Sequence, residues 1–514
     1  MTERSENNLT PALSQAGKYI IIITAFFGWF FGGMHLGITT LSMGSAAKDL
    51  LEATGHKAQR PADRDVALEQ LNAFDTDQNG VLSQDEYELA FFDRNKDGKV
   101  DQAERTRATL QIQADADGDG RVTLEELSAK AAHDRFGAAS SKWFGYYVCA
   151  LLFGGALGGL VFGRLGDRFG RVTGMTAAIC CYSGVSFFAF FARTPEQLWI
   201  ARFVVCMGVG GMWPNGVALM SEAWEGASRP MLAGVIGTSA NIGIFLVGVA
   251  GSIWEVTEDN WEWVMLVGGC PIILGLLVPF IVPESPRWLA DKKMLESGAT
   301  DKDGDKLVEV STWAVFKKPM LGVTLVGILL ATVPLFGGWG SSSWAVKWAD
   351  DAGKTMGDDG LKAKVIQARA LPGIIGSFLG GWIAGLVGRR RSYLINSLIC
   401  LASAQYLFWF CSPSEPISFI VWMAILGFFS GVFFGWLPLF LPELFVTRMR
   451  SAGAGICFNF GRIITAVTVF ITSMLIVHFN NDFGALGRLT SLIYLLGAIG
   501  ILLMPKGVEG EIKD

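Results

Sequence analysis

The stretch that decides the fold reads Gly163-Arg164-Leu165-Gly166-Asp167-Arg168-Phe169-Gly170-Arg171, at the end of an apolar run over residues 142–163. A second stretch, Gly381-Trp382-Ile383-Ala384-Gly385-Leu386-Val387-Gly388-Arg389, ends a later apolar run over residues 366–387. The first glycine, the last glycine and the final arginine have matching spacing, although the second stretch has Gly385 where the first has Asp167. This internal repeat predicts a chain built from two related halves.

Apolar runs of about 20 residues recur along the chain, and each is long enough to cross about 30 Å of hydrocarbon as a helix. The twelve runs cover residues 19–43, 142–163, 172–192, 196–220, 231–254, 262–282, 319–343, 366–387, 392–411, 417–440, 453–478 and 486–504. A buried core helix would explain one such run, but twelve in succession predict a membrane protein. The fold class is therefore all-α, with twelve transmembrane helices in two six-helix halves, which favours a secondary transporter.

Charge is distributed unevenly over the 514 residues. The chain is 51% hydrophobic and 17% charged, below the roughly 25% charged residues of soluble domains. This excludes a disordered chain and a basic nucleic-acid binder. Residues 44–141 hold 20 acidic and 12 basic residues and so carry a net charge of −8, whereas the rest carries +3. A small soluble domain is therefore expected between the first and second transmembrane helices.

Lysine and arginine concentrate in the short loops after the second, fourth, sixth, eighth and tenth runs. Such loops face the cytoplasm, so we expect both termini to be cytoplasmic and the insert to be extracytoplasmic. A bacterial inner membrane suits this arrangement. The expected divisions are a tail and first helix (1–43), the insert (44–141), helices two to six (142–282), a cytoplasmic linker (283–318), and helices seven to twelve with a tail (319–514).

The stretch Gly163–Arg171 resembles the G-x-x-x-D-R-x-G-R loop signature of the major facilitator superfamily. Pro283-Glu284-Ser285-Pro286-Arg287-Trp288 resembles the motif after helix six of sugar porters and their organic-ion relatives, and Pro442-Glu443 with Arg448 follows helix ten in a similar way. The resemblance implies alternating access, with loop ion pairs that hold the cytoplasmic side closed in one state. Its gating residues would be Gly163, Asp167, Arg168, Gly170, Arg171, Glu222, Arg229, Glu284, Arg287, Arg389, Glu443 and Arg448. The alternative explanation of these charged residues is that they only set the orientation of the helices in the membrane and have no gating role.

Ionisable residues at membrane depth are expensive and usually functional. We expect three: His35, Arg202 and Arg462. His35 stands where related symporters have an aspartate that pairs with the helix-four arginine, so it cannot form that pair, although a histidine can itself carry a proton. The alternatives are that His35 is a simple helix contact and that Arg202 binds backbone carbonyls.

Arg462 lies near mid-membrane and needs a counter-charge, which an anionic substrate would supply through a two-pronged guanidinium–carboxylate contact. Further candidates for substrate contact are Asn241, Trp339 and Asn459. Tryptophans near a membrane end are otherwise ordinary interface anchors. The Trp339-Gly340-x-x-x-Trp344 pattern resembles carboxylate and sugar-acid symporters, whereas the paired glutamines usual in hexose porters are missing from it.

The insert contains three stretches that match the calcium-binding loop of the EF-hand. Such a loop supplies oxygen ligands from positions 1, 3, 5, 7, 9 and 12 and has glycine at position 6. The expected ligands are Asp75, Asp77, Asn79, Val81, Ser83 and Glu86 in loop 1; Asp93, Asn95, Asp97, Lys99, Asp101 and Glu104 in loop 2; and Asp115, Asp117, Asp119, Arg121, Thr123 and Glu126 in loop 3. Three matches in series predict three bound Ca²⁺ ions.

The loops begin at residues 75, 93 and 115, which leaves too little chain for separate helices. Segments 84–92 and 102–114 must each serve as the exit helix of one loop and the entry helix of the next. A helix separates its two ends by 1.5 Å per residue, so loops 1 and 3 are expected to pair and loop 2 to lie apart. Extracellular calcium sites bind weakly and are usually filled; a structural and a regulatory role both stay open.

The favoured hypothesis is a secondary transporter, symporter-like, of a small anionic organic solute such as a carboxylate or sugar acid. The alternatives are a neutral sugar transporter and a calcium-sensing membrane protein on a transporter scaffold. No nucleophile motif or nucleotide loop occurs in the sequence, so an enzyme is not expected. The expected partners are a solute and the lipid bilayer, without nucleic acid, and the chain is expected to be monomeric.

Overall fold

The computed structural model describes residues 13–93, 98–100, 114–224, 229–296, 315–445, 450–476, 479 and 481–504. Twelve helical segments among them are long and apolar enough to cross a membrane, which confirms the predicted number. The helices are α2 (Gln15–Ala53), α3 (Pro61–Phe74), α4 (Gln84–Phe92), α6 (Leu124–Phe169), α7 (Arg171–Ala189), α8 (Pro195–Ala223), α9 (Arg229–Ile253), α10 (Trp263–Gly269), α11 (Ile272–Ile281), α12 (Pro286–Glu296), α13 (Leu321–Leu335), η2 (Phe336–Ser341), α14 (Ser342–Met356), α15 (Leu361–Val387), α16 (Arg389–Phe410), α17 (Pro416–Glu443), α18 (Arg450–Leu475), α19 (Phe483–Ser491) and α20 (Ile493–Leu502).

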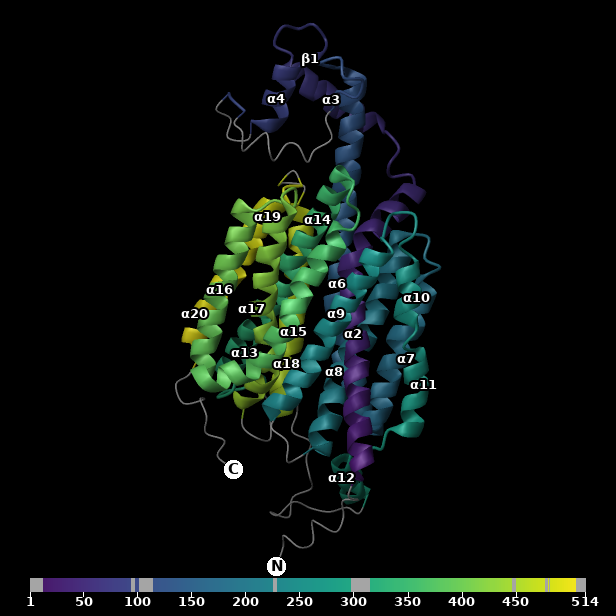
Figure 1. The fold of residues 1–514 in the computed structure, drawn as a ribbon, viewed down its shortest axis with the longest axis vertical. Coiled ribbons are helices and arrows are strands. Elements are labelled where there is room, and N and C mark those ends of the chain that lie inside the picture. Colours follow the sequence, from purple (N-terminus) through teal and green to yellow (C-terminus); the bar gives the residue numbers. More distant parts are fainter. Residues whose placement is uncertain are drawn as a thin grey trace, which may run out of the picture.

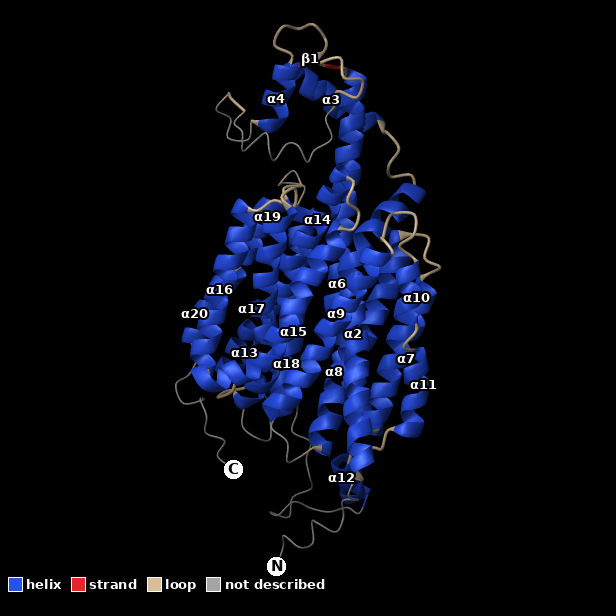
Figure 2. Ribbon diagram, in the orientation of Figure 1, coloured by secondary structure: helices blue, strands red, loops and turns tan. Residues whose placement is uncertain are grey.

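The spanning helices form two groups. The first half consists of α2 and α6 to α11, and the second consists of α13 to α20 (Figure 1). The halves meet where α15 packs on α9 and α18 packs on α6. Apart from two short paired strands in the insert and the connecting loops, the described residues are helical (Figure 2). The architecture is thus the predicted bundle of two halves with an insert.

The internal repeat is visible in the backbone. Gly170 ends α6 and begins α7 with φ 112° and ψ 147°. Gly388 does the same between α15 and α16 with φ 91° and ψ 146°. A positive φ is readily adopted only by glycine, so the matching glycines make the same sharp turn at the same place in each half. At Gly170 a side chain would also collide with Glu284, whose Oε2 lies 2.2 Å from the position of a Cβ.

Close helix packing inside the first half depends on small residues, as is common between membrane helices. A Cβ at Gly158 on α6 would lie 1.8 Å from the carbonyl oxygen of Met207 on α8. The two helices therefore touch through their backbones at this point. This contact holds α6 close against α8.

The insert is a continuation of two membrane helices. α2 runs unbroken to Ala53 and α6 starts at Leu124, so the expected divisions at 43/44 and 141/142 fall inside continuous helices. Between them, strands β1 (Leu82–Ser83) and β2 (Arg121–Val122) pair antiparallel. The strands belong to loops 1 and 3, so the predicted pairing of these two loops is confirmed. Segment 84–92 forms α4 as expected, whereas 102–113 lies outside the described residues.

Arg135 of α6 holds the insert to the membrane helices. Its guanidinium donates to the Asp63 carboxylate at 2.8 Å and to the backbone carbonyls of His56 at 2.7 Å and Ala58 at 2.9 Å. These bonds join the segment after α2 and the start of α3 to α6. The hydrogen bond from Arg135 also lowers the pKa of Asp63. Also on α6, the Lys130 ammonium lies 4.5 Å from the ring centroid of Phe91 on α4.

Candidate functional site

A cavity of about 100 Å³ lies between the two halves. The first half lines it from α2, α6, α8 and α9, and the second half lines it from α13, η2, α15, α17 and α18. Its polar and aromatic lining residues are Trp29, Trp213, Asn241, Trp339, Arg369, Ser430, Phe434, Phe458 and Arg462. None of the described lining residues is an aspartate or glutamate. The cavity is therefore apolar and aromatic, with two cationic side chains.

Arg462 reaches across the boundary between the halves. It projects from α18, and its Nη1 donates to the carbonyl oxygen of Gly155 on α6 at 2.9 Å. Its guanidinium carbon lies 4.7 Å from the ring centroid of Phe458. A guanidinium has five N–H donors in a rigid fork, so the bond to Gly155 leaves donors for a ligand. The side chain expected to bind an anion does line the cavity.

Arg369 on α15 is a second cation in the same cavity, and the expectation of three ionisable residues at membrane depth was wrong in omitting it. Its Nη2 donates to the carbonyl oxygen of Gly338 at 3.0 Å, and its guanidinium carbon lies 5.5 Å from the Trp339 ring centroid. Its buried Nε has no hydrogen-bond partner within the described part of the chain. The sequence signal was present, because Arg369 stands inside the apolar run 366–387.

Trp339 lies in η2, a π-helical segment between α13 and α14. Such segments are rare and occur frequently at functional sites. The segment turns Trp339 toward the cavity, where its side chain is 7% exposed. The expected seventh helix ended at residue 343, whereas the structure continues it through α14 to Met356.

Asn241 on α9 is the third expected residue that lines the cavity. Its Nδ2 donates to Ser377 Oγ on α15 at 2.7 Å, which is a bond between the two halves. An amide in this position can exchange its partner for a polar group of a solute.

The other three expected substrate residues lie away from the cavity lining. Arg202 is fully buried and donates to the carbonyl oxygen of His35 at 2.9 Å and to Thr39 Oγ1 at 2.7 Å. The His35 ring packs against Tyr182, with ring centroids 5.2 Å apart. Asn459 faces α6, where a Cβ at Gly159 would lie 3.1 Å from its Oδ1. Arg202 thus matches the alternative in which it binds a backbone carbonyl of the first helix.

The loop residues of the first half form a network around the start of α7. The Glu284 carboxylate accepts hydrogen bonds from the backbone N–H groups of Arg171 at 3.0 Å and Val172 at 3.1 Å. Burial raises the pKa of Glu284. The Arg171 guanidinium pairs with Asp167 and lies 3.7 Å from Glu222. Glu284 and Arg171 therefore fix the loop between α6 and α7.

Two further expected gating residues contact each other in the second half. Arg389 and Glu443 form an ion pair at 3.2 Å within the second half. The Arg168 guanidinium lies 5.2 Å from the Phe169 ring centroid, and Arg287 is exposed. Gly163 lies in α6, where an added Cβ would have nothing within 4 Å. Arg448 and the side chain of Arg229 lie outside the described residues. The pairs described here each stay within one half, so they show local positioning.

Two loops of the insert bring carboxylates together in the manner of a calcium site. Oxygens of Asp75, Asp77 and Glu86 lie within 4.8 Å of one another, and so do those of Asp115, Asp117 and Glu126. The ligand positions between these carboxylates hold Asn79, Val81 and Ser83 in loop 1 and Asp119, Arg121 and Thr123 in loop 3. Three clustered carboxylates with carbonyl and hydroxyl oxygens beside them are the donor set that Ca²⁺ prefers.

The backbone of these loops agrees with this assignment. Glycine at position 6 has a φ of 84° in Gly80, 79° in Gly98 and 78° in Gly120. Each of these glycines donates its N–H to the aspartate at position 1, at 2.8, 2.8 and 2.9 Å. Loop 2 therefore shares this turn through Asp93 and Gly98, and Lys99 follows it. The other expected ligands of loop 2, Asn95, Asp97, Asp101 and Glu104, lie outside the described residues.

Glu86, at position 12 of loop 1, is held in its ionised form. Its carboxylate accepts hydrogen bonds from the hydroxyl and backbone N–H of Thr76 and from Ser83, and these lower its pKa to about 2. An ionised carboxylate at this position is the form that ligates Ca²⁺.

Comparison with known proteins agrees with this geometry. Residues 133–468 match the family model of the Major Facilitator Superfamily, and residues 68–91 and 112–129 match the EF hand model. The cis,cis-muconate transport protein of Acinetobacter baylyi is 25% identical over 62% of this chain and 74% of its own. The niacin transporter NiaP of the same organism is 24% identical over 71% of this chain and 86% of its own. The crystal structure of a D-xylose-proton symporter, 17% identical, covers 92% of this chain and 97% of its own with a TM-score of 0.54.

Proposed function

We propose, from the premise that this chain belongs to the Major Facilitator Superfamily, that it carries a small organic anion across a membrane by alternating access. The observation that carries the proposal is the central cavity with Arg369 and Arg462 and without an acidic residue among its described lining. Access would alternate by rocking of the two halves around this site.

An unpaired charge is costly inside a membrane protein. A cation inside a membrane protein is stabilised by a counter-charge or by backbone carbonyls. The two guanidiniums each have one carbonyl partner, and Nε of Arg369 has none among the described atoms. A carboxylate between them would satisfy the remaining donors in bidentate contacts. The aromatic lining suits a planar apolar body attached to that carboxylate.

The relatives support an acidic solute. Proteins similar to this chain are named as transporters of cis,cis-muconate and of gallate, the latter from Pseudomonas putida and 26% identical over 62% of this chain and 74% of its own. We therefore place the solute among the carboxylates. A neutral sugar would leave both guanidiniums without a counter-charge.

The insert is proposed to bind Ca²⁺ on the extracytoplasmic side, with both termini in the cytoplasm. Bound ions would neutralise the converging carboxylates of loops 1 and 3 and hold α3, α4 and α6 together. The charged oxygens would come from Asp75, Asp77 and Glu86 in loop 1 and from Asp115, Asp117 and Glu126 in loop 3. Loop 2 is proposed as a third site.

A thermal-shift panel on the purified protein tests the proposed solute class. The panel contains cis,cis-muconate, gallate, nicotinate and, as the neutral comparison, D-xylose. We expect at least one acid to raise the melting temperature of the wild type and to lose this effect in both Arg369→Gln and Arg462→Gln. Stabilisation by D-xylose alone, equal in wild type and both variants, would overturn the anion proposal.

A further inference from the structure

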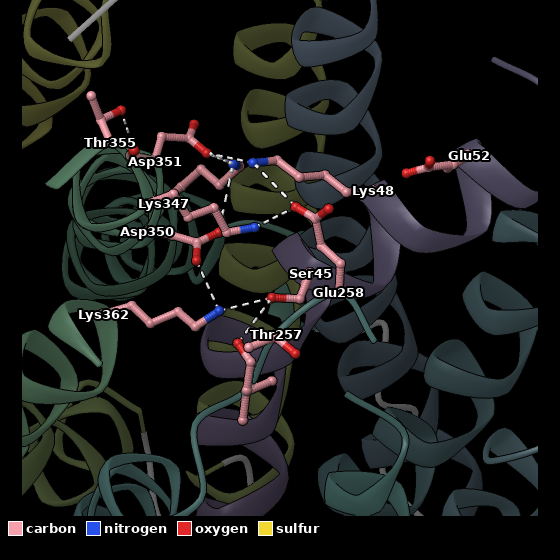
Figure 3. A network of polar contacts seen from close by, with 12 residues as sticks. Ser45, Lys48, Glu52, Thr257, Glu258, Lys347, Asp350, Asp351, Thr355 and Lys362 are labelled. Atoms are coloured by element: carbon pink, nitrogen blue, oxygen red, sulfur yellow. Dashed lines mark hydrogen bonds and ion pairs between the residues drawn. The ribbon is translucent and has the colours of Figure 1, made fainter. Parts of the chain in front are cut away.

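A cluster of lysines and carboxylates joins the two halves (Figure 3), and its α14 members lie at the end of the bundle that carries the insert (Figure 1). We call it the insert-side cluster. Its members are Lys48 of α2, Glu258 of the loop after α9, Lys347, Asp350, Asp351 and Lys354 of α14, and Lys362 of α15. None of these residues was expected from the sequence to be functional, and none lines the central cavity.

Asp350 lies at the buried centre of the cluster. Its Oδ1 is 2.8 Å from the Lys362 ammonium, and its Oδ2 is 3.8 Å from the Lys347 ammonium. The side chains of Lys347, Asp350 and Lys362 are 1%, 5% and 2% exposed. Lys362 also donates to Ser45 Oγ of α2 at 2.8 Å. The second half therefore keeps a buried carboxylate between two lysines and binds the first half through one of them.

Two further contacts cross between the halves. Lys48 of α2 lies 3.1 Å from Asp351 of α14, and Asp351 also binds Lys347 at 2.5 Å. Glu258 of the first half pairs with Lys354 of the second half. Figure 3 shows these residues as a continuous chain of polar contacts between α2 and α14. Ser45, Lys48 and Glu258 thus face Lys362, Asp351 and Lys354 across the boundary.

Such a cluster has two low-energy arrangements. When the halves are in contact, each buried charge needs its partner, because an unpaired buried ion is strongly destabilising. When the halves separate, water enters and hydrates the same groups. An apolar contact of the same area would instead resist hydration. A contact made of charged side chains, such as the insert-side cluster, is therefore suited to repeated opening and closing.

We propose that the insert-side cluster is the gate that closes the central cavity on the insert side, and that Asp350 is the positioning residue that holds it closed. This proposal rests on the proposed alternating-access function. The insert is fixed to the first half through α2, α6 and Arg135. When the gate opens, the insert therefore moves with the first half and away from α14.

Thiol accessibility at Ser45 measures the gate directly. Ser45 is fully buried under Lys362, and a serine-to-cysteine change alters little volume. The full-length Ser45→Cys protein in lipid nanodiscs is treated with a charged methanethiosulfonate reagent, and modification of residue 45 is followed by peptide mass spectrometry. Thr54→Cys, at the exposed end of the same helix, reports the reactivity of an open site.

Removal of the Asp350 charge should open the gate. In the double variant Ser45→Cys/Asp350→Asn, Lys362 and Lys347 lack their shared counter-charge. This loss destabilises only the closed state, because water hydrates the lysines when the halves separate. We therefore expect labelling of residue 45 to become at least about tenfold faster. Asp358→Asn is the matched control, because Asp358 pairs with Lys364 at 2.7 Å in an exposed position within the second half. It should leave the labelling rate unchanged.

Lys48→Gln gives a second, milder test if Asp350→Asn does not fold. It removes the Lys48–Asp351 contact but leaves Asp351 paired with Lys347, and it should also speed labelling. Equal labelling rates in the parent and in whichever of these variants fold would overturn the gate, as would an equal increase in Asp358→Asn. Labelling needs no solute, so failure of every solute to be transported would count against the proposed function and not against the gate.

Discussion

Replacement of Arg462 by glutamine should separate acids from their neutral analogues. Arg462 donates to Gly155 at 2.9 Å and stacks on Phe458 in the cavity. Glutamine can keep a hydrogen bond to the Gly155 carbonyl but loses the charge and the fork of donors. The change therefore removes the interaction with a carboxylate while it preserves the contact between the halves.

The size of the effect follows from the contact that is lost. A hydrogen bond to a charged group contributes about 1.5–3 kcal/mol. Since about 1.4 kcal/mol is tenfold in affinity, the dissociation constant of the preferred acid should rise about 10- to 140-fold. The primary amide of the same acid carries no charge and can still accept a hydrogen bond from glutamine, so its dissociation constant should rise by less than that of the acid.

Isothermal titration calorimetry of the purified protein measures both constants. Arg488→Gln is the matched control, because Arg488 also donates to a backbone carbonyl, that of Phe408, and lies 4.2 Å over the ring of Trp409, yet does not line the cavity. Binding of the acid should be unchanged in that variant. If Arg462→Gln binds the acid as tightly as the wild type does, or loses acid and amide equally, the assignment of Arg462 to the carboxylate is refuted.

Three further predictions concern packing, metal and pH. Gly158→Ala should lower the melting temperature, because its Cβ would meet a backbone oxygen at 1.8 Å, whereas Gly137→Ala on the same helix, with nothing within 4 Å, should not; a fall in both would refute the packing argument. Glu86→Gln should reduce the Ca²⁺ stoichiometry by one in calorimetric titration, and Asp85→Asn, next to it but not a ligand, should keep it; an unchanged stoichiometry in Glu86→Gln would exclude loop 1. The pKa of Asp63 is lowered in the folded state, so its carboxylate stabilises the insert above the unfolded-state pKa of about 3.9, and this stabilisation is lost as pH falls through the folded-state pKa. Asp63→Asn should therefore make the stability of the insert, measured by limited proteolysis, less dependent on pH in this range. Identical pH profiles of the variant and the wild type would contradict this.

Sequence patterns predicted local structure well, because each depends on neighbours in the chain. The apolar runs predicted twelve spans, which is the number found. Glycines with matching spacing predicted a repeat, and Gly170 and Gly388 make the same turn. The distance between calcium loops predicted which of them pair, since the length of a shared helix decides which loop ends lie together.

The arrangement of polar groups across the bundle could not be predicted in this way. Arg202 was a weaker candidate for the site than Arg462, and the structure shows that it donates to the backbone carbonyl of His35 and does not line the cavity. Arg369 was overlooked inside an apolar run, and only the packing of α15 against η2 shows that it shares a cavity with Arg462.

The sequence by itself determined the two-half membrane architecture, the position of the insert and the spacing of its EF-hand-like loops. Only the tertiary structure decided which cations line the cavity and which lysines and carboxylates join the halves at the insert side. The physical reason is that periodicity assigns a residue to a face of its own helix. Which helix that face meets depends on packing between distant segments, as in the contact between Lys48 and Asp351.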